Sequence, residues 1–380
     1  MRTRLVGLLF ATLLLSAAAV QAQETLDVYT NSDTNISDWW TNSVAPAFEA
    51  ANPDYRINVV ITGGGGAGND PIADRAFAAL TTGDDPQVDM FENQDPFRPE
   101  GAIDAGLWTE FSADNVPSYD NILDAAKLTP YNLPYRGSQV LLAYDSTKVA
   151  EADVPHTWDD LITWIGANPG QFIYGRPDRG GSGRNFVVRA IHEANGRDPS
   201  LFTVDNFDAA KAKEAFAGAW KILNDMAPNL YDNAAYPAGN TPTLQLLAQG
   251  AVSMVPAWSD QALQAISVGA LPDTIKLVQL EDLPFSGGYS AATIPTNAAH
   301  QEGALALTEF LLSSEIQTSV VQEIGGFPAV RWELLPEDLQ QEFTDVIADQ
   351  VPVFPSGDWE AAMNDGWYST VATGISPDDE

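Results

Sequence analysis

The amino-acid sequence predicts an α/β protein of two lobes, and two observations carry this prediction. Residues 25–95 alternate strand-like and helix-like segments in the order β-α-β-α-β, which is typical of a parallel sheet with helices on its faces. Removal of a predicted export signal, residues 1–22, leaves 358 of the 380 residues, which is more than one hydrophobic core usually holds. A hydrophobic content of 45% is that of an ordinary globular protein.

Residues 1–22 have the pattern of a cleaved signal peptide. Arg2 and Arg4 precede an apolar run over residues 5–15, and a small residue, Ala22, ends the segment. The run is shorter than the ~20 residues that a membrane-spanning helix needs. No cysteine follows it to carry a lipid. We therefore expect a freely soluble periplasmic protein that begins at Gln23.

The charge of the chain excludes some classes of partner. The formal net charge is -34, so the surface repels nucleic acid and anionic lipid. The acidic residues are spread along the whole chain, which favours a role in solubility over a role in binding one cationic partner. Cysteine is absent, so disulfides and thiol chemistry contribute nothing.

Local patterns predict the elements of the first part of the chain. Its strands are short, β-prone segments bounded by turn residues, and its helices show apolar residues at helical spacing. The first helix is expected to have Asn35 or Ser37 as its N-cap and to end before Pro53. The expected strands span 25–29, 55–61 and 87–91, and the expected helices span 36–51 and 72–80.

The second part of the chain continues the α/β pattern. A long strand-like stretch opens it, Thr157 is a typical helix cap, and one later segment is strongly amphipathic. The expected strands span 133–144 and 251–255, with another that begins at 172–174. The expected helices span 155–165, 185–194, 209–226, 243–248, 305–312 and 314–323.

Two glycine-rich loops are candidate binding elements. Residues 63–68 fit a G-x-G-x-x-G pattern between a strand and a helix, and we include Gly64 and Gly65 as candidates. The dinucleotide interpretation is discounted, because an exported protein rarely meets such a cofactor and the loop follows the second strand. Backbone N–H groups at a helix N-terminus can still bind anionic or polar groups. A flexible loop without a ligand is an equal alternative.

The second glycine-rich loop lies among five arginines. We expect Ser182, Gly183 and Arg184 to clamp a carboxylate or phosphate together with Gly181, through a helix N-terminus and a guanidinium. The alternative is that the arginines pair with surface acids. The five are Arg176, Arg179, Arg184, Arg189 and Arg197.

Other candidate ligand contacts are aromatic or acidic. Trp258 follows a predicted buried strand, where its ring could stack on a sugar, although a core position is the alternative. The carboxylates of Asp33, Asp95 and Asp260 would suit a cationic solute. Arg136 and Tyr289 complete the candidates from this part of the argument.

No catalytic arrangement stands out. His156, His192 and His300 lie far apart in the sequence without metal-ligand spacing. The G-x-S-x-G, H-E-x-x-H and P-loop patterns are absent from the sequence. We expect a binding protein that is not an enzyme and that has no cofactor and no metal.

Four stretches in order carry a family resemblance. They are residues 79–91, 140–165, 249–258 and 286–312, for example QGAVSMVPAW at 249–258. The chain resembles the extracellular solute-binding proteins of ABC importers, in the group that includes maltose-binding protein. The resemblance implies a type II periplasmic-binding-protein fold, with two lobes joined by crossing strands near 135–138 and 290–293. The resemblance also implies a small-molecule ligand and a membrane permease as the partner, and we expect a monomer.

The resemblance also implies the lobes and part of the site. Lobe one takes residues 24–135 and 291–325, and lobe two takes 136–290 and 326–380. Trp258 stands at the place of the family's ring-stacking tryptophan. Two loops stand at the places of ligand-contact loops, and they contain Asn31, Ser32, Asp33 and Thr34, and Asn93, Gln94 and Asp95.

The ligand stays open between several classes. Residues 168–184 look like the branch that handles thiamine-like, phosphonate-like or ferric ligands, although the tyrosine pair of ferric binders is missing. A small polar solute with an anionic group is the leading interpretation, followed by a sugar and then by a polyamine. An exported hydrolase is the alternative from a different class, and a sensing role is an alternative to transport.

Overall fold

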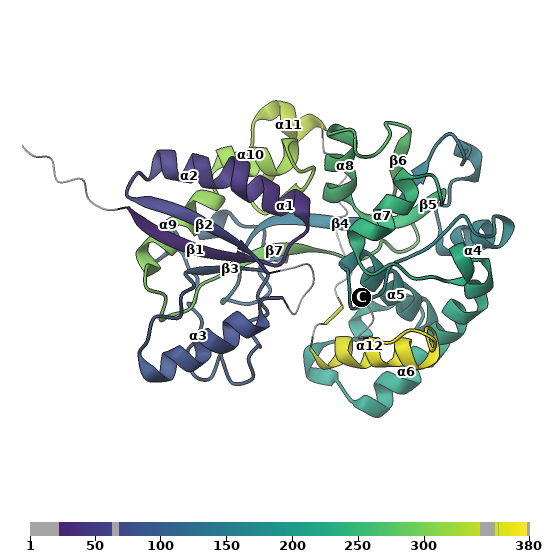
Figure 1. The fold of residues 1–380 in the computed structure, drawn as a ribbon, viewed down its shortest axis with the longest axis horizontal. Helices are drawn as coiled ribbons and strands as arrows, with labels where there is room; N and C mark the ends of the chain where they lie inside the picture. Colours follow the sequence, from purple (N-terminus) through teal and green to yellow (C-terminus); the bar gives the residue numbers. More distant parts are fainter. Residues whose placement is uncertain (1–22, 63–67, 343–353, 356, 378–380) are drawn as a thin grey trace, which may run out of the picture.

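A computed structural model describes residues 23–62, 68–342, 354, 355 and 357–377 (Figure 1). Two lobes lie side by side, and long strands run from one into the other. The strands are β1 (Glu24–Thr30), β2 (Tyr55–Ile61), β3 (Met90–Glu92), β4 (Leu133–Asp145), β5 (Met254–Trp258), β6 (Ile275–Val278), β7 (Gly287–Thr293) and β8 (Phe327–Pro328). The α-helices are α1 (Thr34–Trp39), α2 (Ala45–Ala51), α3 (Asp70–Thr82), α4 (Trp158–Ala167), α5 (Gly181–Ala194), α6 (Ala209–Met226), α7 (Asn240–Ala248), α8 (Ser259–Ser267), α9 (Gln301–Leu311), α10 (Ser314–Gln322), α11 (Glu337–Glu342) and α12 (Asp358–Thr370).

Lobe one is built on the parallel strands that the sequence predicts. β1 pairs in parallel with β2 on one side and with β3 on the other, so that Val28 stands opposite both Val59 and Met90. Leu26 and Val28 are fully buried because helices cover the sheet, with α2 and α10 above it and α3 below it in Figure 1. A π-helical turn, Trp40–Val44, links α1 to α2.

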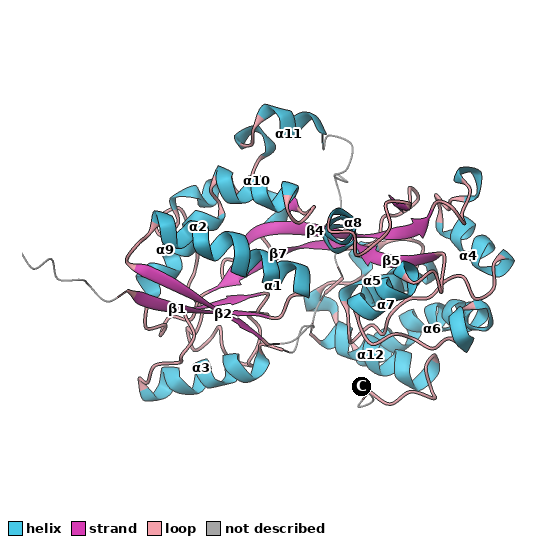
Figure 2. Ribbon diagram, turned by 45° about the horizontal axis from the view of Figure 1, so that its top comes forward, coloured by secondary structure: helices cyan, strands magenta, loops and turns pink. Residues whose placement is uncertain are grey.

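Two long strands connect the lobes. The first part of β4 pairs antiparallel with β7, with Arg136 opposite Ser290, and its second part pairs with β5 and β6. β7 in turn pairs with β3 of lobe one. The described strands therefore form one sheet in the order β2-β1-β3-β7-β4-β5, which Figure 2 shows running through the middle of the molecule.

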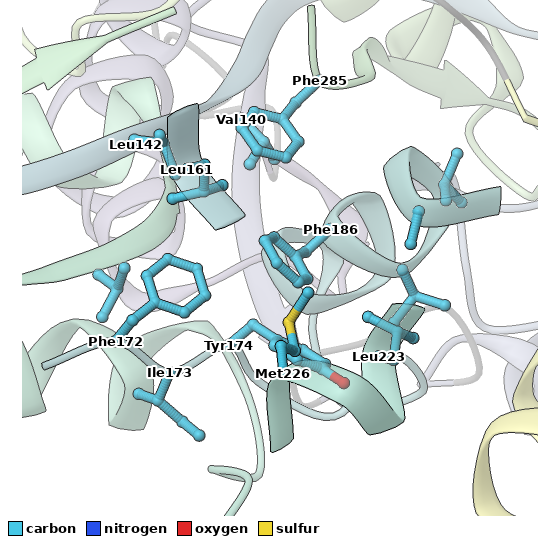
Figure 3. Close-up of a cluster of buried hydrophobic side chains, with 14 of the residues drawn as sticks. Val140, Leu142, Leu161, Phe172, Ile173, Tyr174, Phe186, Leu223, Met226 and Phe285 are labelled. Atoms are coloured by element: carbon cyan, nitrogen blue, oxygen red, sulfur yellow. The ribbon is translucent and has the colours of Figure 1, made fainter. Parts of the chain in front are cut away.

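Lobe two has its own hydrophobic core. Figure 3 shows side chains of β4, α4, α5 and α6 that meet there, among them Val140, Leu161, Phe186 and Leu223, which are all fully buried. The pairings of β4 with β5 and β6 are antiparallel. This differs from the expectation of a mainly parallel sheet in each lobe, because β4 enters lobe two as a crossing strand and pairs there with strands that return.

The α/β class and the two-lobed architecture are confirmed. Our division of the chain into lobes stays a proposal, and the two buried cores help to place it. Val330 and Leu335 pack in the core of lobe one, whereas Trp359 and Trp367 pack in that of lobe two. The chain therefore stays with lobe one for about ten residues beyond residue 325, the boundary that the sequence suggested.

Several local predictions are confirmed and others differ. Thr157 caps α4 in a reciprocal capping box with Asp160, as its sequence pattern indicates. The first helix begins at Thr34, two residues earlier than expected, so its N-cap is Asp33 and not Asn35 or Ser37. Phe172 makes a single bridge to Met254 in place of a regular strand. The predicted signal peptide lies outside the described residues, and no described helix has the length and hydropathy needed to span a membrane.

His192 is expected to make the stability of lobe two depend on pH. Burial in α5, between Phe202 and Phe354, lowers the pKa of its ring to about 4, and neither ring nitrogen has a hydrogen-bond partner among the described residues. An unfolded histidine titrates near 6.5, so the stabilisation from the neutral ring is lost as the pH falls from about 6.5 to about 4. In urea unfolding, His192→Leu should lose less stability than the wild type between pH 7 and pH 4.5. Equal losses in both proteins would contradict this assignment.

Candidate functional site

A buried charge network stands where the two lobes meet. Glu92, the last residue of β3, accepts hydrogen bonds from the hydroxyls of Thr30 and Tyr135. The Arg136 guanidinium donates to the same carboxylate, with Nη2 at 2.8 Å from Oε1. Trp40 donates its indole N–H to the Tyr135 hydroxyl. The network therefore links the ends of β1 and β3 in lobe one to the crossing strand β4.

Glu92 and Arg136 are both charged in this network. Burial would raise the pKa of Glu92, but the Arg136 charge and the hydroxyl hydrogen bonds outweigh it, so the pKa lies below its ordinary value. Burial would likewise lower the pKa of Arg136, and the Glu92 charge reverses that effect. The pair is fully enclosed, which makes each charge dependent on the other.

Arg136 also faces lobe two. Its Nη2 donates to Ser32 Oγ at 3.0 Å, and its Nη1 lies 3.6 Å from the Asp260 carboxylate in the first turn of α8. Asp260 accepts a further hydrogen bond from Ser138 Oγ at 2.5 Å. One guanidinium from a crossing strand therefore contacts groups from both lobes.

A second contact between the lobes runs through Asn240, the first residue of α7. Its Nδ2 donates to Asp33 Oδ2 at 2.7 Å. Its Oδ1 accepts from the backbone N–H of Ser182 at 3.0 Å and from Ser182 Oγ at 2.9 Å. Asn240 thus joins the loop after β1 to the N-terminus of α5. We call the set Asp33, Arg136, Ser182, Asn240, Trp258 and Asp260 the interlobe junction.

The junction carries more negative than positive charge. Burial raises the pKa of Asp33, and the nearby Asp260 charge adds to that rise, whereas the Asn240 hydrogen bond opposes it. Burial also raises the pKa of Asp260, although Arg136 and Ser138 favour its charged form. Glu92 already neutralises Arg136. The buried carboxylate of Asp260 and the half-buried carboxylate of Asp33 therefore depend on hydrogen bonds and on a guanidinium that they share with Glu92.

The second glycine-rich loop allows close packing at the junction. A Cβ atom on Gly181 would lie 2.6 Å from the Trp258 ring, and one on Gly180 would lie 2.6 Å from Asn240 Oδ1. The Trp258 indole therefore rests on the backbone at the start of α5. Trp258 is partly exposed at the end of β5.

The Arg184 side chain contacts residues of its own lobe, lobe two. Its Nε lies 3.0 Å from the Glu360 carboxylate of α12, and its Nη2 donates to the Phe354 carbonyl at 3.3 Å. Burial raises the pKa of Asp95 of lobe one, and repulsion from the nearby Glu360 charge raises it further. The Arg184 guanidinium is thus paired with a carboxylate of the protein, whereas the sequence interpretation expected it to bind an anionic ligand.

The other candidate residues lie around the junction or outside the described part of the chain. Ser32 Oγ accepts from Asn93 Nδ2 at 3.1 Å, and Gln94 donates to the carbonyls of Asp95 and Arg98. Tyr289 of β7 packs its ring against Gly137 of β4. Asn31 is buried and Thr34 is exposed at the start of α1, and Gly64 and Gly65 lie outside the described residues.

Sequence analysis missed four residues of this arrangement. They are Glu92, Tyr135, Ser138 and Asn240. The Asn-Thr-Pro sequence at 240–242, directly after a glycine, signals a helix start and could have drawn attention to Asn240. No sequence signal distinguishes Glu92 from the other acids that follow strands.

Two hollows lie elsewhere on the described surface. One, of about 580 Å³, is lined by residues of α4 and α6 that include Ile162 and Met226. The other, of about 370 Å³, lies on lobe one and is lined by polar residues that include Asp27 and Asp89. Among the residues that the structure describes, no group of three or more histidine, aspartate or glutamate side chains is arranged to hold a metal ion.

The two-lobed fold is shared with known binding proteins. The family model described as bacterial extracellular solute-binding protein matches residues 43–343. The chain therefore belongs to the family of bacterial extracellular solute-binding proteins. None of the curated proteins matches it in sequence.

Solved structures agree with this fold at low sequence identity. A spermidine/putrescine ABC transporter substrate-binding protein from Streptococcus pneumoniae is 15% identical, with a TM-score of 0.65 over 92% of this chain and 98% of that chain. A periplasmic thiamin-binding protein is 15% identical, with a TM-score of 0.63 over 93% and 97%. An apo ferric ion-binding protein from Pasteurella haemolytica is 10% identical, with a TM-score of 0.63 over 92% and 96%.

Proposed function

We propose that the protein is the periplasmic substrate-binding component of an ABC importer. It captures a small polar organic solute between its lobes and delivers it to the transmembrane permease, and it acts by binding and not by catalysis. Membership of the solute-binding family supports this proposal, as do the ABC-transporter proteins among its structural neighbours. The observation that carries it is the interlobe junction, where polar groups of both lobes converge on one buried place.

We propose further that the solute carries a protonated amine. Asp33 and Asp260 are enclosed carboxylates with one shared guanidinium, and a second cation would stabilise both. Trp258 is partly exposed two residues before Asp260, and an aromatic ring also attracts cations. A polyamine, the third interpretation of the sequence, satisfies this description.

The competing proposal is a solute whose anionic group sits at Gly181–Arg184. The N-terminus of α5 favours an anion in principle. Arg184 already pairs with Glu360, however, and Asn240 Oδ1 already accepts from Ser182. These two contacts favour the amine over the anion.

A thermal-shift screen tests the proposal. Polyamines, thiamine, amino acids, sugars, phosphonates, carboxylates and ferric ion should be compared at equal concentration. A ligand at 100 times its Kd adds about 2.7 kcal/mol to stability, which a melting curve resolves. A stabilising amine supports the proposal, whereas a stabilising anion without an amine would overturn its ligand class. Failure of the loaded protein to stimulate ATP hydrolysis by the reconstituted importer would overturn the transport role.

Removing a junction carboxylate should weaken amine binding. Asp33→Asn keeps the size and an acceptor but removes the charge, so a charged hydrogen bond worth about 1.5–3 kcal/mol is lost, or roughly 10- to 150-fold in Kd. Titration calorimetry with the best amine from the screen measures this change. Asp225→Asn, on the exposed face of α6, is the matched control and should bind normally. A normal Kd for Asp33→Asn would show that this carboxylate does not contact the solute.

A further inference from the structure

The side-chain amide of Asn240 has a fixed orientation. The backbone N–H of Ser182 can only donate, so the acceptor Oδ1 must face α5. Nδ2 must then face Asp33, and it donates to the Asp33 carboxylate. In the hydrogen bond between the lobes, Asn240 of lobe two is therefore the donor and Asp33 of lobe one is the acceptor.

The Asn240–Asp33 contact differs in kind from the other contacts of the junction. Arg136 and Ser138 belong to the crossing strand β4, so their bonds to Asp260 lie at the connection itself. Asp33 instead directly precedes α1, and Asn240 begins α7, so both lie outside the crossing strands and 207 residues apart. A rotation of one lobe against the other about the crossing strands would separate this pair.

Neighbouring residues fix Asn240 in place. Ser182 binds Oδ1 through two groups, and the absence of a side chain on Gly180 leaves the room that the amide occupies. Gly239 precedes Asn240 with φ +127°, a value that favours glycine, so the chain can turn sharply into α7. The amide is therefore presented to lobe one as a rigid group.

We infer that Asn240 is a positioning residue that holds the two lobes together when no solute is bound. It donates to the carboxylate that the proposed solute would use, so an amine at Asp33 must share or replace the Asn240 hydrogen bond. Asn240 thereby sets how far the empty protein is closed. The link to the solute rests on the proposed function, but the closure of the empty protein does not.

Closure can be measured without a solute. The chain contains no cysteine, so cysteines introduced at the exposed positions Asp74 of α3 and Lys213 of α6 carry unique spin labels. Figure 1 shows these helices on the same side of the two lobes. Pulsed electron paramagnetic resonance then gives the distribution of distances between the labels in the empty protein.

Asn240→Asp should shift this distribution to longer distances. The new carboxylate still accepts from Ser182 but faces Asp33 with like charge. The double variant Asp33→Asn, Asn240→Asp reverses donor and acceptor, and it should restore the short distances. Asp33→Ala, which leaves α5 untouched, should lengthen them as well and serves if Asn240→Asp does not fold.

Two results would overturn the inference. One is a wild-type distribution in Asn240→Asp or in Asp33→Ala, and the other is a double variant that stays as open as the single one. Because no solute is present, neither result depends on the identity of the ligand. In turn, the predicted distances do not change if the amine screen finds no ligand.

Discussion

Glu92→Ala should lower the free energy of unfolding by about 3–5 kcal/mol, because it leaves a buried charge without its partner. Arg136 is almost fully enclosed and relies on Glu92 as its nearest counterion, at 2.8 Å. The hydroxyls of Thr30 and Tyr135 also lose the acceptor that they share. Urea unfolding of the whole protein, followed by circular dichroism, measures the change.

A partly exposed ion pair provides the control for Glu92→Ala. Glu360→Ala breaks the pair with Arg184, where both side chains still meet water, so about 0–1 kcal/mol is expected. If the two variants lose the same stability, the network around Glu92 is not the buried unit described above.

The pH dependence of stability provides a second test of the Glu92 network. The folded pKa of Glu92 is depressed, so its contribution is present above the unfolded value and is lost as the pH falls through the folded value.

The sequence was most informative where one element buries one face. The strand 55–61 and the helix 209–226 occur with the predicted bounds, because each carries a complete periodic pattern. The sequence was least informative where tertiary pairing decides the structure. The residues 172–174 are as apolar as a strand, yet they make only a single bridge, from Phe172 to Met254 of β5.

The junction could be predicted in part. Asp33, Arg136, Trp258 and Asp260 were candidates, and the structure brings them together. Asn240 was missed, since its importance comes from a partner 207 residues away that no local pattern reveals. Arg184 stood in a conspicuous cluster of arginines, but the cluster says nothing about the acid from α12 that pairs with it.

The glycines of the loop 180–183 show how a local pattern can point to the right place for a different reason. We expected them to free backbone amides for a ligand. In the structure they allow close packing, because Gly181 lies under Trp258 and Gly180 lies beside Asn240. The loop therefore shapes the junction by the side chains that it lacks.

Gly183→Ala should destabilise lobe two by about 3 kcal/mol, at the upper end of the range for an overpacked core. An added Cβ atom would lie 2.1 Å from the carbonyl oxygen of Gly175 and 3.1 Å from that of Arg176. Backbone atoms cannot rotate away as a side chain can, so α5 has to move as a whole. Urea unfolding measures the loss.

Gly166→Ala is the matched control, because it makes the same chemical change in a helix with open space around it. A Cβ atom there meets nothing within 4 Å, so the variant should be as stable as the wild type or up to about 1 kcal/mol more stable. A Gly183→Ala protein of wild-type stability would show that α5 can shift at little cost. A shift of α5 would also displace Ser182, which holds Asn240, so Gly183→Ala should change the distances between the lobes as well.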